Sequence, residues 1–222
     1  MGWKAACIVA TTTDKPLLSK IAHHDHELAD QVATQIAPSY LFHRQSSFED
    51  GCYPQNGNLY VGAYHHSIVI GDIALTNSCF EEKAPPIISQ LNQLLPNCCC
   101  VALLLHSVVN LYGYAVFHNG KPVRIRAGCA DDGEYLNFGV PIAEELPLDA
   151  KASTTPTGER IWTVDIQGTP EEFDHSSIGE EYVFAISKRF FGEQFDQFDH
   201  DQLTMSEYKL QKKSFLSRLM GK

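Results

Sequence analysis

Residues 111–127, LYGYAVFHNGKPVRIRA, decide the fold, because two alternating runs flank the pair Asn119-Gly120. A two-residue type I′ turn needs positive φ at both central positions, and asparagine followed by glycine adopts it readily. The segment therefore predicts a β-hairpin in which His118 pairs with Lys121.

This pairing predicts two faces for the hairpin, because successive strand residues point to opposite sides. One face is a core face, made of Tyr112, Tyr114, Val116, Val123, Ile125 and Ala127. The other places Arg124 and Arg126 beside Gly113 and Ala115, where small residues would leave a shallow slot. Guanidinium groups bind carboxylate or phosphate, so the slot is a candidate anion site, with His106 or Tyr64 nearby. The alternative is that the arginines pair with the chain's own acids, Asp131, Asp132, Glu144 or Glu145.

The rest of the chain predicts an α+β fold. Strand-like runs gather at Leu59–Val69 and Val101–Phe138, and helical patterns occupy both ends. Consecutive hairpins imply a mainly antiparallel sheet with flanking helices. We expect one domain over residues 1–192, with the Pro- and Thr-rich stretch 141–170 largely irregular.

The last 30 residues, 193–222, read as an acidic connector followed by a basic amphipathic C-terminal helix from Tyr208 to Met220. Tyr208, Phe215 and Leu219 would share one face of that helix, with Leu216 close by. Such a helix can bind a membrane, a partner's groove or its own acidic body. Self-docking is the simplest interpretation, and a homodimer through this helix is the next.

Charge is distributed unevenly over the 222 residues. The formal net charge is −10, but residues 204–222 carry +4, so the remainder carries −14. An acidic body repels phosphates and argues against nucleic-acid binding. It suits a basic protein partner, or it serves solubility alone.

The sequence lacks the patterns of a membrane span, a secretory signal and a cofactor-binding motif. No apolar run reaches the roughly 18 residues of a membrane span, and no secretory signal is visible. Seven cysteines without a signal indicate free thiols in a reducing compartment, hence a cytoplasmic protein. Cys98-Cys99-Cys100 reads as small hydrophobes entering a buried strand, with at most two on one face. No cofactor or metal motif is present, so we expect neither.

The histidines give one further candidate. His23 and His26 are three residues apart, a helical spacing that can chelate a metal. No third ligand is indicated, and Asp25 sits where it would cap a helix. Capping is therefore the favoured interpretation.

Ordered motifs point to a family. Met1-Gly2-Trp3-Lys4 precedes the first strand, and Tyr53-Pro54 is followed by Gly57, Tyr60 and Gly62; then come His106-Ser107-Val108-Val109, Asn119-Gly120, Val123-Arg124, Asp131-Asp132-Gly133, Gly139, Pro141 and Phe190-Phe191-Gly192. Their order and spacing resemble an uncharacterised bacterial domain family over roughly residues 1–192. The resemblance implies a fold unit and no activity, and it supplies no catalytic residues.

These observations favour a non-enzymatic bacterial protein-binding module, for example an immunity- or antitoxin-like protein that neutralises a basic partner. The first alternative is an enzyme or sensor for a small anion that uses the Arg124 and Arg126 slot. The second is a structural homo-oligomer assembled through its tail.

Overall fold

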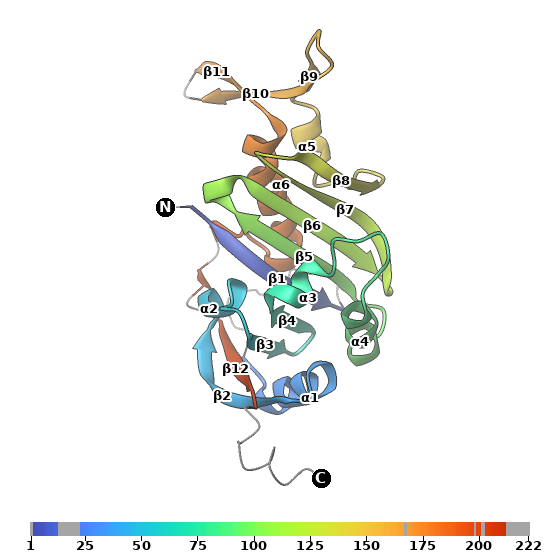
Figure 1. Ribbon diagram of the computed structural model, residues 1–222, viewed down its shortest axis with the longest axis vertical. Coiled ribbons are helices and arrows are strands. Elements are labelled where there is room, and N and C mark those ends of the chain that lie inside the picture. The colour runs from blue at the N-terminus through green and yellow to red at the C-terminus, as the bar shows by residue number, and fades with distance from the viewer. Residues whose placement is uncertain (1, 13–22, 167, 198, 201–202, 212–222) are drawn as a thin grey trace, which may run out of the picture.

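A nine-stranded antiparallel sheet forms the body of the protein (Figure 1). The computed structural model describes residues 2–12, 23–166, 168–197, 199–200 and 203–211. In spatial order the strands are β2 (Tyr40–Ser47), β12 (Thr204–Leu210), β3 (Asn58–Tyr64), β4 (Ser67–Gly71), β1 (Lys4–Thr11), β5 (Cys99–His106), β6 (Leu111–His118), β7 (Lys121–Cys129) and β8 (Gly133–Gly139). The expected α+β class, with a mainly antiparallel sheet, is confirmed.

Helices cover both faces of this sheet, so the strands near its centre are apolar on both sides. The helices are α1 (His26–Ile36), α2 (Phe48–Cys52), α3 (Ile73–Asn77), α4 (Pro86–Leu94), α5 (Leu146–Asp149) and α6 (His175–Phe191). One core packs the sheet against α6 and α2, and the other packs it against α1 and α4. Val101 and Ala102, consecutive in β5, lie in different cores.

A second, three-stranded sheet projects from this body, beyond α5 in Figure 1. It consists of β9 (Ala152–Thr154), β10 (Arg160–Ile166) and β11 (Thr169–Phe173), and we call residues 152–173 the arm. Much of the stretch 141–170, expected to be irregular, therefore has regular structure. Its β9 and β11 were missed because they are only three and five residues long.

The hairpin turn has the predicted conformation, since φ is +50° at Asn119 and +77° at Gly120. The predicted register holds for His118 with Lys121, but it is wrong beyond Pro122. A bulge there shifts the pairing by one residue, so Arg124 faces Val116 and Arg126 faces Tyr114. Proline has no N–H to donate to the ladder, which suits it to a bulge.

The segment after Gly192 also differs from expectation. Tyr208 lies in β12, between β2 and β3, and not in a helix. Its ring is buried and its hydroxyl donates to Asp30 Oδ1 at 2.6 Å. The other residues assigned to the tail helix, Phe215, Leu216 and Leu219, lie outside the described residues. The helix nearest the C-terminus within the described residues is α6.

Because β12 lies inside the sheet, a substitution in its buried face should lower the stability of the whole protein. Met205 is 0% exposed in the core that packs against α2 and α6, so Met205→Ala should lower the free energy of unfolding by about 2–5 kcal/mol. Urea unfolding measures this. Lys209→Ala, on the same strand but with an exposed side chain, serves as the control and should cost no more than about 1 kcal/mol. An unchanged free energy of unfolding in Met205→Ala would mean that residues 193–222 do not contribute to the stability of the body.

Candidate functional site

Arg124 and Arg126 do not line an open slot. The bulge turns both side chains onto the face that α6 covers, and each arginine is only 2% exposed. Gly113 and Ala115 belong to the opposite face, beside Ile125. The expected core face was thus right for Tyr112, Tyr114 and Val116. Ile125 and Ala127 are buried on the opposite face, and Val123 is 39% exposed.

Glu145 is the main partner of Arg124, as the ion-pair alternative anticipated. Arg124 Nε donates to Glu145 Oε1 at 2.7 Å and Nη2 donates to Oε2 at 2.8 Å, which is a bidentate pair. Arg124 Nη1 donates to Asn137 Oδ1 at 2.6 Å. Burial alone disfavours the charge on Arg124, but Glu145 outweighs it and raises the pKa of the guanidinium. Because Glu145 is 0% exposed, the pair is sealed from solvent.

Arg126 connects the pair to α5 and α6. Its Nε donates to Glu134, and its Nη1 lies 3.5 Å from Glu145 Oε2 and 3.8 Å from Asp149 Oδ1. Its guanidinium carbon lies 4.3 Å from the ring centre of Tyr182 on α6. One guanidinium thus bridges β7, β8, α5 and α6.

Asp149 joins this network to the arm. Its Oδ1 accepts hydrogen bonds from Tyr182 at 2.6 Å and from Arg160 Nη2 at 2.8 Å. The indole Nε1 of Trp162 donates to the Tyr182 hydroxyl at 3.1 Å. Burial, together with the bond to Asp149, raises the pKa of Tyr182 to about 12, so the phenol stays protonated and keeps donating. We call this set the anchor network: Arg124, Arg126, Arg160, Glu134, Glu145, Asp149, Tyr182 and Trp162.

The anchor network is balanced in charge, with three arginines against three carboxylates. It therefore has no unmatched positive charge with which to bind an anion. Its chemistry is structural, because it fixes β10 of the arm to the body through Arg160 and Trp162. The network thereby determines where the exposed residues of the arm are held.

The exposed surface of the arm is acidic. Its four carboxylates, on Glu159, Asp165, Glu171 and Glu172, belong to exposed residues. Its single basic residue is Arg160, which the anchor network holds. This projecting, negatively charged surface is the candidate functional site.

Tyr64 does not lie near the arginines, and His106 contacts a different side chain. Tyr64 is on β3, five strands from β7, which at about 4.8 Å per strand is roughly 24 Å. Its buried hydroxyl donates to Thr204 O at 2.8 Å. His106, at the end of β5, stacks on Tyr53 with ring centres 6.3 Å apart. The strand order therefore separates Tyr64 from the arginines, and the ring partner of His106 is Tyr53.

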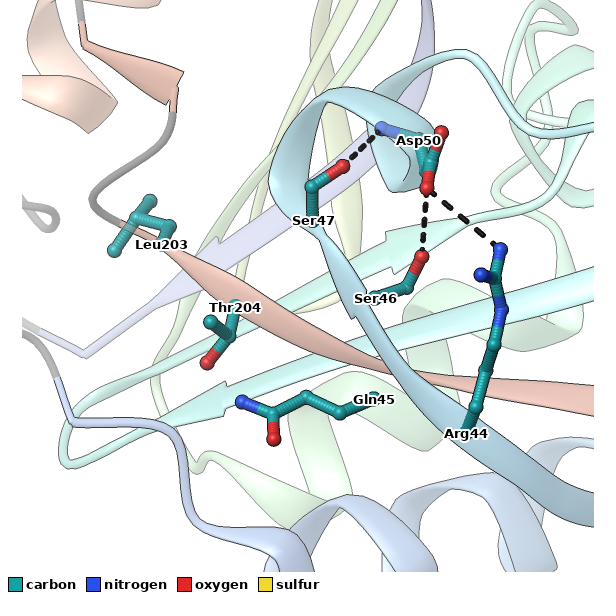
Figure 2. Close-up of a pocket in the computed structure, with 7 residues that line it drawn as sticks. All are labelled: Arg44, Gln45, Ser46, Ser47, Asp50, Leu203 and Thr204. Carbon is teal, nitrogen blue, oxygen red and sulfur yellow. Dashed lines mark hydrogen bonds and ion pairs between the residues drawn. The ribbon is translucent and has the colours of Figure 1, made fainter.

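Two surface hollows meet at Asp50 of α2. A polar hollow of about 470 Å³ lies at the end of β2 and β12, and Figure 2 shows its lining side chains. There Ser46 donates to Asp50 Oδ2 at 2.9 Å, and Arg44 Nη2 lies 3.8 Å from the same oxygen. The second hollow, of about 440 Å³, is lined by Trp3 and Tyr53 among others. Neither hollow contains Arg124, Arg126 or Tyr64.

A histidine pair that the sequence did not single out surrounds Ser206 of β12. The Ala63 N–H donates to His24 Nδ1 at 3.2 Å, and His24 Nε2 lies 2.9 Å from Ser206 Oγ. His26 Nδ1 lies 3.2 Å from the same oxygen. His24 Nδ1 also lies 3.3 Å from the Ala63 carbonyl oxygen, so the tautomer of the ring decides which of its nitrogens donates. Asp25 caps α1 by accepting from the Leu28 N–H at 3.0 Å, as expected.

The part of the chain that the structure describes contains no cluster of three or more His, Cys, Asp or Glu side chains arranged to hold a metal. Within the same residues, no helix is long and apolar enough to span a membrane.

The chain belongs to a family of unknown function, DUF6928, whose sequence model matches residues 5–208. The match confirms the resemblance to an uncharacterised domain family and extends it past Gly192 through most of β12. No curated protein and no solved structure matches the chain.

The anchor network predicts that two adjacent glutamates contribute unequally to the free energy of unfolding. Glu145→Gln should lower the free energy of unfolding by about 3–5 kcal/mol, because it leaves buried arginine charge without its partner. Glu144→Gln is the control, because Glu144 pairs with Arg189, whose side chain is 39% exposed, and should cost about 1 kcal/mol or less. Urea unfolding at pH 7 measures both. Equal losses of unfolding free energy in the two variants would show that the buried ion pair stabilises the protein no more than the exposed one.

The histidine pair predicts a pH dependence. Burial and neighbouring His26 lower the pKa of His24, and the opposing effects of Ala63, Asp25 and Asp30 do not outweigh them. The stabilisation that His24 contributes is therefore complete above its unfolded pKa of about 6.5 and is lost as the pH falls.

The gap in unfolding free energy between wild type and His24→Gln should accordingly narrow from pH 7.5 to pH 5 in urea titrations. His23→Gln, at an exposed neighbour, should give a gap that does not change with pH. A His24→Gln gap that is constant with pH would contradict the assignment.

Proposed function

We propose that this member of DUF6928 is a non-enzymatic protein-binding module whose acidic arm docks a basic protein. The immunity- or antitoxin-like role is the concrete form of this proposal, with a positively charged toxin as the partner. We place this function in the bacterial cytoplasm, which suits seven cysteines that are all free.

The use of arginine is the observation that carries the proposal. All five arginines among the described residues, Arg44, Arg124, Arg126, Arg160 and Arg189, form ion pairs with the chain's own carboxylates. The described residues hold eleven Lys and Arg against 25 Asp and Glu, a net charge of −14. The remaining acids give the exterior a negative potential, which steers a basic protein toward it.

The arm carries part of this negative charge on a projecting surface that a partner can reach. Thr163 pairs with Glu172 and Val164 with Glu171, so the ladder between β10 and β11 fixes both glutamates. Ile166, 42% exposed, adds an apolar contact at the tip. The anchor network holds the base of the arm, so little conformational entropy is lost on binding.

The small-anion alternative depended on an exposed pair of guanidinium groups, and burial of Arg124 and Arg126 removes that basis. The tail-mediated oligomer depended on Phe215, Leu216 and Leu219, which lie outside the described residues. The acidic arm therefore has the stronger support.

Charge reversal tests this proposal. Tagged chain, isolated from its native host at low salt, should retain a basic protein that is released as salt rises, because screening weakens the attraction. With that purified partner, E171K/E172K should weaken binding by at least about tenfold in surface plasmon resonance. E81K/E82K makes the same charge change at two exposed residues elsewhere and should bind nearly as wild type.

Absence of any salt-released basic protein would overturn the proposed function. Equal weakening by both double variants would show that net charge alone, and not the arm, determines binding.

A further inference from the structure

Cys98 and Cys100 form a close thiol pair at the start of β5. Their sulfur atoms lie 3.4 Å apart, and both side chains belong to the core under α4. Cys99 points to the opposite side and packs against the other core. The alternation expected for this triplet thus places two thiols together.

The environment of Cys98 differs from that of the other buried thiols. The hydrogen bond with Cys100 lowers the pKa of Cys98, whereas burial raises that of Cys79 to about 12 and also raises that of Cys52. A thiolate is the reactive form of cysteine, and the lowered pKa favours Cys98 as the nucleophile of the pair. Cys98 also directly follows Pro96 and Asn97, which are both exposed.

We propose that Cys98 and Cys100 are a redox-active pair that a peroxide converts to an intrachain disulfide. The Cys98 thiolate attacks one oxygen of hydrogen peroxide, the O–O bond breaks, and a sulfenic acid and hydroxide form. The Cys100 sulfur then attacks the Cys98 sulfur and expels the sulfenic oxygen as water. In total two thiols and one peroxide give one disulfide and two waters.

The two sulfur atoms have only a short distance to cover. The sulfur atoms must approach from 3.4 Å to about 2.05 Å. Cys98 precedes the first residue of β5, so the β5–β6 ladder does not include its backbone. Both residues are only 1% exposed, which favours a small neutral oxidant over a bulky disulfide.

The Cys98 backbone also links the pair to two neighbouring elements. Its N–H donates to Leu95 O at the end of α4, and its carbonyl accepts from the Asn119 N–H in the hairpin turn, both at 3.1 Å. Closing the disulfide should therefore move this junction first.

Mass spectrometry of the folded protein tests the proposal. Hydrogen peroxide should lower the mass of the peptide holding Cys98 and Cys100 by about 2 Da, and dithiothreitol should reverse the change. Cys98→Ser and Cys100→Ser should each abolish the mass loss, whereas Cys99→Ser, the residue between them, should retain it. Circular dichroism should show that all three variants are folded.

Three outcomes would overturn the proposal. The first is a peptide that gains oxygen atoms without losing about 2 Da. The second is a folded Cys99→Ser variant that does not lose mass. The third is a protein whose seven thiols all stay reduced at peroxide concentrations that oxidise a free cysteine.

Discussion

The bidentate ion pair between Arg124 and Glu145 is the interaction on which the rest of the structure depends. A charged pair removed from water is favourable only when its geometry is good and its remaining hydrogen-bond groups are satisfied. Here Asn137 and the carbonyl groups of Phe138 and Gly139 accept hydrogen bonds from Arg124 Nη1. Arg126 then extends the charge balance to Asp149, so a buried ionic cluster takes the place that an apolar core would otherwise fill.

The bulge at Pro122 explains how this cluster came to lie inside the protein. A one-residue shift moves every later side chain of a strand to the other face of its sheet. Without the shift, the arginines would lie beside Gly113 and Ala115, on the face that Ile125 occupies in the structure. With the shift, the arginines lie under α6. There Arg126 packs on the Tyr182 ring and Arg124 donates to Glu145. The one extra residue of the bulge thus separates a surface arginine pair from an internal one.

Local sequence signals predicted the local structure well. Asn119-Gly120 gave the turn, Asp25 gave the cap of α1, and the apolar run from Val101 gave a central strand. The bulge was not predicted because a two-residue turn sets the register only as far as the ladder stays regular. The placement of Tyr208 in a strand was missed because its partners, Leu59 and Phe42, are 149 and 166 residues away in sequence. The candidate site was harder to predict from the sequence. The acids of the arm form one surface only because Arg160 and Trp162 fix the position of the arm.

The position of β12 has a consequence for synthesis of the chain. In the nine-stranded sheet, β2 has β12 as its only neighbour, yet β12 begins at Thr204 and β2 begins at Tyr40. At 5–20 residues per second, a ribosome takes roughly 8–30 s to cover the intervening residues. During that interval β2 has no strand to pair with, and it carries the exposed side chains of Leu41 and Phe42. The nascent chain should therefore be a substrate for ribosome-associated chaperones until β12 emerges.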